Sequence, residues 1–116
     1  MCHVLVIEDD WFIAEHIEAI ARDSGATTVD RAQTESEAVT IALAHPPAVI
    51  LSDVALAEGT GPRAVAAIRK KIGPCPVIFI TGTPEACEPC EYAAAILGKP
   101  LVPGTIGDAF RAVAPH

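Results

Sequence analysis

The sequence predicts an α/β domain in which helices cover both faces of a parallel five-stranded sheet. Three observations support this prediction: short apolar runs alternate with helical patterns, the runs are apolar on both faces, and no linker or repeat interrupts the alternation. With 116 residues, the chain is long enough for one domain with a sizeable core. The expected strands are residues 3–7, 27–32, 48–52, 76–80 and 94–97.

Capping and turn residues indicate where the helices in the first half of the chain begin and end. Apolar residues recur on one helical face between residues 10 and 23, and Gly25 ends that pattern. Thr34 and Glu37 form a capping-box pattern, which predicts a second helix that stops before Pro46. The strand between these helices is more polar than the others, so we expect it at a sheet edge.

The second half of the chain predicts a third helix, a poor fourth helix and a last helix weakened by Gly104 and Gly107. Pro62 stands near the start of the third helix, where its missing N–H costs little. The segment from Pro84 to Cys90 is expected to be short or irregular, because Pro89 would remove a donor and clash with the preceding turn. Residues 103–113 make the last helix.

The charge and hydropathy of the chain argue against two classes of partner. A net charge of −7 repels phosphate backbones and anionic lipid, so we expect no nucleic-acid or membrane partner. No apolar run approaches the roughly 20 residues of a membrane span. A strand pattern starts at His3, so no signal peptide is expected. The expected location is cytoplasmic, and the four cysteines are then expected as free thiols.

Polar residues follow four of the five apolar runs. In folds of this kind, ligands bind at the carboxyl ends of the strands, so these side chains are expected to share one site. The residues at these positions are Glu8, Asp9, Asp10, Ser52, Asp53, Thr81, Gly82, Gly98 and Lys99.

The chemistry of this set points to phosphoryl transfer. Carboxylates are ligands for Mg²⁺, and a carboxylate is also a nucleophile toward phosphorus. The reaction needs positioning and neutralisation of the phosphoryl oxygens, which a cation, a lysine and a hydroxyl donor would supply. Each residue alone has a plain structural explanation; Asp10, for instance, can be a helix N-cap. Their shared position at the ends of separate strands is far more specific.

Four segments resemble the response-regulator receiver family, and the similarity covers essentially the whole chain. They are "VLVIEDD", "VILSDVAL" with Gly61 after it, "PVIFITG" and "LGKPL". The resemblance implies a flavodoxin-like (βα)5 fold with strand order 2-1-3-4-5. "FITG" also resembles the FATGUY subgroup, largely single-domain receivers, although Ile80 replaces its Ala and Pro84 stands where that motif has Tyr.

Residue by residue, the resemblance implies a Mg²⁺ site beside a phospho-acceptor. Glu8 and Asp9 would hold Mg²⁺, Asp9 more directly. Asp53 would be phosphorylated and would also ligate the metal, and the carbonyl of Ala55 would be a further ligand.

The same resemblance implies roles for two residues at the ends of the last strands. Thr81 would bond a phosphoryl oxygen, and Lys99 would pair with the phosphoryl group or with Asp53. The Lys99–Pro100 peptide bond is expected to be cis.

The implied function is a stand-alone receiver of bacterial two-component signalling, spanning residues 1–116 without an output domain. A sensor histidine kinase or a histidine phosphotransfer protein would supply the phosphoryl group. The domain would catalyse only its own phosphorylation and dephosphorylation. It would signal by protein–protein contact, with a homodimer as one possible assembly, or act as a phosphate sink.

Two alternatives stay open at the level of sequence. One is a degenerate receiver that acts as an unphosphorylated interaction module, against which the intact set of Asp9, Asp53, Thr81 and Lys99 argues. The other is a thiol redox or metal module through Cys87 and Cys90; a lone C-x-x-C pair is a weak signal, because a closed zinc site needs four ligands. The histidines show no metal-ligand spacing and are expected to be surface or structural residues.

Overall fold

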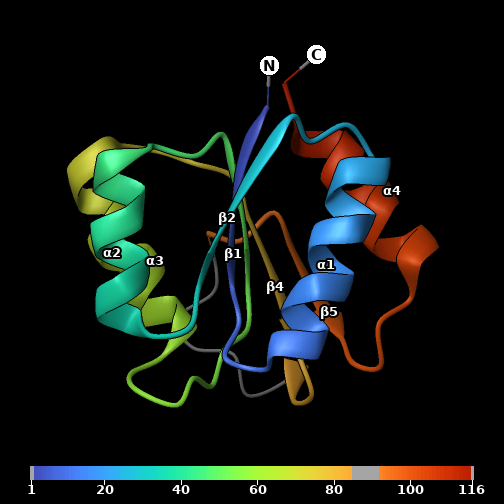
Figure 1. Ribbon diagram of the computed structural model, residues 1–116. Coiled ribbons are helices and arrows are strands. Elements are labelled where there is room, and N and C mark those ends of the chain that lie inside the picture. The colour runs from blue at the N-terminus through green and yellow to red at the C-terminus, as the bar shows by residue number, and fades with distance from the viewer. Residues whose placement is uncertain (1, 85–91, 116) are drawn as a thin grey trace.

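The five predicted strands form one parallel sheet in the order β2-β1-β3-β4-β5 in the computed structural model, which describes residues 2–84 and 92–115 (Figure 1). The predicted fold class and strand order are confirmed. The elements are β1 (His3–Ile7), α1 (Trp11–Asp23), β2 (Thr28–Ala32), α2 (Glu35–Ala44), β3 (Val49–Ser52), α3 (Gly61–Ile72), β4 (Val77–Thr81), β5 (Ala95–Gly98) and α4 (Pro103–Val113).

Apart from the expected fourth helix, the expected elements agree with the observed ones to within one or two residues. β2 lies at the sheet edge, as its polarity predicted. The Lys99–Pro100 peptide bond is cis, also as predicted. The prediction of an irregular segment from Pro84 to Cys90 falls, apart from Pro84, outside the described residues.

The sheet separates two apolar layers, and each layer is closed by a pair of helices. Figure 1 shows α2 and α3 on one face of the sheet and α1 and α4 on the other. The apolar layer between the sheet and these two helices, α2 and α3, contains Ile50 of β3, Val65 of α3 and Phe79 of β4, all fully buried. The layer on the other face contains Ile17 of α1 and Phe110 of α4, also fully buried. Because both faces are covered, the central strands are apolar throughout.

Side-chain caps begin three of the helices. Asp10 accepts hydrogen bonds from the backbone N–H groups of Phe12 and Ile13, so the plain role of this residue as an N-cap is confirmed. Thr34 accepts from the Glu37 amide at 3.1 Å. The Glu37 carboxylate accepts in return from the amide of Gln33, one residue earlier than in the usual capping box. Thr60 caps α3 in the same way.

Within the described parts of the chain, every helix is too short or too polar to cross a bilayer.

Candidate functional site

Parallel pairing brings the polar ends of four strands to one edge of the sheet. Ile7 pairs with Ser52, and Thr81 pairs with Gly98. The chain continues in register for one more residue, since the Asp53 amide donates to the Ile7 carbonyl at 2.8 Å. The side chains that follow β1, β3 and β5 therefore meet at the carboxyl edge, where a ligand site is expected in this fold.

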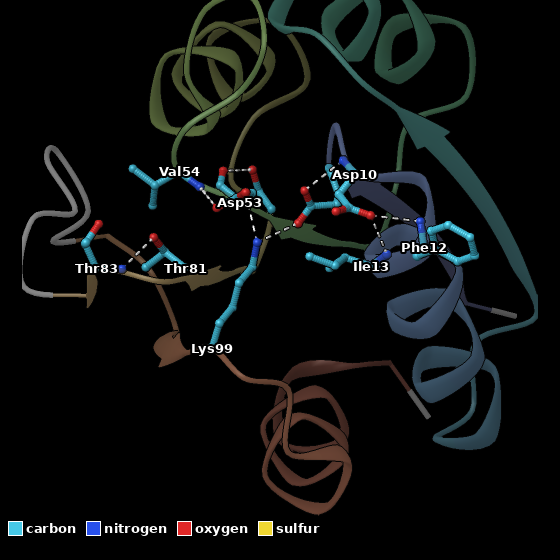
Figure 2. Close-up of polar contacts among 10 residues, drawn as sticks. Asp10, Phe12, Ile13, Asp53, Val54, Thr81, Thr83 and Lys99 are labelled. Carbon is cyan, nitrogen blue, oxygen red and sulfur yellow. Dashed lines mark hydrogen bonds and ion pairs between the residues drawn. The ribbon is translucent and has the colours of Figure 1, made fainter.

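Asp53 lies at the centre of this site. The residue is only 8% exposed. Its Oδ1 accepts from the Val54 amide at 2.7 Å, and its Oδ2 accepts from Lys99 Nζ at 3.1 Å (Figure 2). Both carboxylate oxygens are thus oriented by donors, one from the backbone and one from a cation.

Glu8 is the most deeply buried acidic side chain of the site, at 1% exposure. Its carboxylate accepts from Lys99 Nζ at 3.0 Å and from the Asp10 amide at 3.1 Å. Burial raises the pKa of Glu8 to about 7, and the negative charge of Asp53 adds to this rise, while the two hydrogen bonds oppose it. Glu8 and Asp53 are therefore two carboxylates that share one ammonium group.

Lys99 is the cation that holds this pair together. Burial by itself would lower its pKa, but the hydrogen bonds to Glu8 and Asp53 outweigh that effect and raise the pKa of Lys99. The ammonium group is therefore charged at neutral pH. The family resemblance implied that Lys99 pairs with the phosphoryl group or with Asp53. The bond to Glu8 was missed, because nothing in the sequence says which of several carboxylates a lysine reaches.

Three carboxylates converge closely enough to hold a cation. Glu8, Asp9 and Asp53 each offer an oxygen, and these oxygens lie within 4.8 Å of one another. Two of the residues are buried and Asp9 is exposed, so the cluster opens to solvent on the Asp9 side. An oxygen-only donor set with an open side fits Mg²⁺, which is bound by few carboxylates and keeps several waters.

The remaining predicted residues lie around this cluster. Thr81 is buried, and its Oγ1 accepts from the Thr83 amide at 3.2 Å, which leaves its own O–H available to donate. Ala55 lies in the loop after β3, where it forms a β-bridge with Thr60. The structure therefore places every predicted site residue at the same edge of the sheet, with Ala55 in the adjoining loop.

Close packing requires a glycine at position 61, and the sequence did not reveal this requirement. A Cβ built on Gly61 would overlap the Asp53 carbonyl oxygen, and it would lie 2.5 Å from Ser52 Oγ. The Gly61 amide donates to the Val54 carbonyl at 2.8 Å, which closes the loop after β3. Ser52 Oγ in turn donates to the Asp53 carbonyl at 2.7 Å. The sequence did indicate that Ser52 makes such a bond: a hydroxyl at the end of a buried strand needs a hydrogen-bond partner, because buried polar groups are rarely left without one.

The described cysteines are far from this chemistry. Cys2 and Cys75 are buried free thiols, as predicted for both. Burial raises the pKa of the Cys75 thiol to about 11, which keeps it protonated. Cys87 and Cys90 lie outside the described residues, so the structure does not test the thiol-module alternative.

The fold and this acidic edge define a signalling module of the receiver type. The chain belongs to the response regulator receiver domain family, whose model matches residues 4–103. The resemblance inferred from the four sequence segments is confirmed.

Regulators named PhyR are among the relatives of this chain. The Phyllosphere-induced regulator PhyR of Methylorubrum extorquens is 35% identical over 106 residues, which cover 89% of this chain and 40% of that protein. A mutant of the anti-anti-sigma factor PhyR from Bartonella quintana is 32% identical, with a TM-score of 0.81, and the match covers 95% of this chain and 48% of that one. The chain thus spans less than half of the length of either PhyR protein.

The similarity in shape extends to a chemotaxis protein of almost the same size. The chemotaxis protein CheY4 of Vibrio cholerae is 28% identical, with a TM-score of 0.86, and the match covers 97% of this chain and 98% of CheY4.

Proposed function

We propose that this domain accepts a phosphoryl group from a phosphohistidine onto Asp53 in a Mg²⁺-dependent reaction. The observation that supports the proposal is the arrangement around Asp53. Its carboxylate is nearly buried, bonded to Lys99 Nζ at 3.1 Å, and grouped with Glu8 and Asp9 at cation-binding distances.

The chemical step is a nucleophilic displacement at phosphorus. An oxygen of Asp53 forms a bond to the phosphorus, the bond from phosphorus to the imidazole nitrogen breaks, and that nitrogen takes up a proton. The Val54 amide orients Oδ1 at 2.7 Å. When bound by Glu8, Asp9, Asp53 and the Ala55 carbonyl, Mg²⁺ would neutralise the phosphoryl oxygens.

Lys99 and Thr81 would stabilise the phosphorylated state. Lys99 Nζ now pairs with both Glu8 and Asp53, so it is positioned to follow the negative charge onto a phosphoryl oxygen. Thr81 would donate its O–H to another phosphoryl oxygen, for which the Thr83 amide bond leaves it available. Together they replace, in the product, the hydrogen bonds that water would make with the phosphoryl group.

A sensor histidine kinase or a histidine phosphotransfer protein would supply the phosphoryl group. The domain would then signal by contact with another protein, by homodimer formation, or act as a phosphate sink, in the cytoplasm and without nucleic acid. The Bartonella relative is described as an anti-anti-sigma factor. This chain covers 48% of that protein. The comparison offers a protein regulator of transcription as a candidate downstream target.

Intact-mass measurement after incubation with Mg²⁺ and acetyl phosphate tests the proposal. The wild-type protein should gain one phosphoryl group, and the gain should vanish with EDTA or in Asp53→Asn. A chain that gains no mass under these conditions would instead support the unphosphorylated interaction module. Equal labelling of Asp53→Asn would show that the acceptor lies elsewhere.

A further inference from the structure

The loop between β3 and α3, residues 53–60, is fastened to the start of α2 by Glu35, the first residue of that helix (Figure 1). Oε1 of Glu35 accepts a hydrogen bond from the Thr60 amide at 3.2 Å. The Glu35 amide donates in the other direction, to the Glu58 carbonyl at 3.1 Å. The sequence did not suggest this contact, because Glu35 and Thr60 are 25 residues apart. Two bonds of opposite direction therefore hold the end of the loop against α2.

A glycine at position 59 lets the loop approach Glu35 this closely. The φ angle of Gly59 is +80°, a conformation in which a residue with a side chain is strained. A Cβ built on Gly59 would overlap Glu35 Oε1 and would lie 2.5 Å from Glu35 Cβ. Because Glu35 Cβ is attached to the backbone of α2, it cannot give way without moving the helix. The contact therefore depends on a carboxylate on α2 and on the missing side chain of Gly59.

The fastened end of the loop lies opposite Ala55, whose carbonyl belongs to the proposed Mg²⁺ site. Ala55 and Thr60 face each other in an antiparallel β-bridge. Beside this bridge, the Gly61 amide donates to the Val54 carbonyl at 2.8 Å. Ala55 itself is exposed, so burial of its side chain does not fix its backbone. The position of the Ala55 carbonyl therefore depends on the strand-like pairing with Thr60, and Thr60 is held in turn by Glu35.

The charge of Glu35 contributes less to this contact than its oxygen does. Arg63 Nε lies 3.6 Å from Glu35 Oε1, and the Arg63 side chain is 73% exposed. An ion pair so open to solvent adds little stability. The hydrogen bond from the Thr60 amide, by contrast, needs only an oxygen acceptor at the same place. A glutamine at position 35 can supply that acceptor without the charge.

We propose that Glu35 is a positioning residue for the Mg²⁺ site, an inference that rests on the function proposed above. Through Thr60, Glu35 holds the loop that carries the Ala55 carbonyl in the conformation that binds the cation. Glu35 is not itself a metal ligand. Residues that orient a ligand from behind are worth a factor of about 10–100 in metal affinity, because a ligand that is already ordered loses less freedom on binding. The start of α2 and the cation site are thereby coupled.

The test is a Mg²⁺ titration of the full chain and three variants, followed by Trp11 fluorescence or NMR. Glu35→Ala removes the acceptor for the Thr60 amide and should weaken Mg²⁺ binding by about tenfold or more. Glu35→Gln keeps an acceptor and should stay within about threefold of the wild type, the scale of an exposed ion pair.

Glu37→Ala is the matched control. It also removes one carboxylate from the first turn of α2, and that carboxylate also accepts from a backbone amide, that of Gln33 at 2.8 Å. This bond lies outside the loop after β3, so Glu37→Ala should bind Mg²⁺ as the wild type does. A loss confined to Glu35→Ala thus separates positioning of the loop from general weakening of the helix or loss of charge.

Amide hydrogen exchange of the metal-free protein gives a second readout that does not depend on Mg²⁺. The Thr60 amide should exchange faster in Glu35→Ala than in the wild type, and Glu35→Gln should restore its protection. Unchanged Thr60 exchange in Glu35→Ala would overturn the role of Glu35. So would a wild-type Mg²⁺ affinity in Glu35→Ala, or equal losses of affinity in Glu35→Ala and Glu35→Gln. A wild-type protein that binds no Mg²⁺ would overturn the proposed function, and this inference with it.

Discussion

The two ends of the parallel sheet carry polar side chains at very different depths. At the carboxyl end, Glu8, Ser52, Asp53 and Thr81 are buried, and in the described residues these are the four polar or charged residues with that property. At the amino end, the side chains of His3 and Asp30 are 24% and 32% exposed, and that of His45 is far more open.

This difference in burial shows that the polar groups at the carboxyl end are the ones whose burial opposes folding. A buried charge is tolerated only when it is paired or bonded, and the carboxyl end meets that condition with one lysine and several backbone amides. Glu8 and Asp53 are held in place before any metal or phosphoryl group arrives. The amino end holds its cluster near the surface, where the same groups cost little. Each of the following experiments tests the comparison by changing one end and measuring the response.

The largest expected effect is loss of Mg²⁺ binding in Asp9→Ala. Asp9 supplies the exposed oxygen of the acidic cluster, so its removal takes away one of the three carboxylates that could hold a cation. We expect Mg²⁺ affinity to fall by at least the factor of about 10–100 that is typical when a residue behind a metal ligand is lost. The metal-free variant should be at least as stable thermally as the wild type, because a repelling charge is gone.

Trp11 fluorescence or NMR titration measures this change. Asp10→Ser is the matched control, since it also removes a charge in the same loop but keeps a side-chain cap for α1. An undiminished Mg²⁺ affinity in Asp9→Ala would show that the cation does not bind at the carboxyl end.

A smaller effect is expected from Gly61→Ala. The new methyl group would meet the Asp53 backbone carbonyl, which accepts a hydrogen bond from Ser52 Oγ and cannot move without disturbing the site. We expect the free energy of unfolding to fall by about 1–3 kcal/mol, as for overpacking. Urea denaturation measures it.

Gly104→Ala in α4 is the control for this variant. A Cβ at Gly104 meets nothing within 4 Å, so the free energy of unfolding should rise by about 0.5 kcal/mol. Equal responses at the two glycines would show that the backbone behind Asp53 is not specially constrained.

The third expected effect, similar in size to that of Gly61→Ala, is the pH dependence of the stability of the metal-free protein. The pKa of Glu8 is about 7 in the folded chain, against an ordinary value of 4.5. Between these values the folded chain keeps a proton that the unfolded chain has lost, so stability falls as pH rises from about 4.5 through 7. Glu8→Gln should remove this part of the pH dependence, a difference on the order of 1–3 kcal/mol between pH 5 and pH 8.

Urea denaturation in EDTA at the two pH values checks this prediction. Glu58→Gln, at an exposed position in the loop after β3, should keep the wild-type dependence. If Glu8→Gln followed the wild-type curve as well, burial of Glu8 would not govern its ionisation.

The fold was predictable because local and long-range signals agree. Apolar runs such as "VILS" are apolar on both faces, which favours a central parallel strand, and Thr34 with Glu37 marks a helix start. The carboxyl-end site followed from topology, since parallel strands bring Glu8, Asp53 and Lys99 to one edge without knowledge of any side-chain conformation.

The remaining side-chain contacts depend on the three-dimensional arrangement of the chain, which the spacing of residues in the sequence does not encode. Nothing in the sequence assigns Lys99 to Glu8 as well as Asp53, because the choice depends on the rotamer of a long side chain. Likewise, His3 and His45 have no regular spacing with Asp30; they meet only because β2 pairs with β1 and α2 ends beside them. Such clusters become visible only after the strand order and register are known.

Borohydride trapping of the phosphorylated protein shows directly whether Asp53 is the phospho-acceptor. An acyl phosphate on an aspartate is reduced to the side-chain alcohol, which marks the acceptor residue permanently, and peptide mass spectrometry then locates it. After incubation with Mg²⁺ and acetyl phosphate, we expect reduction at Asp53 and none at Asp9, Asp10 or Glu8. Reduction at another carboxylate, with Asp53 unmodified, would contradict it.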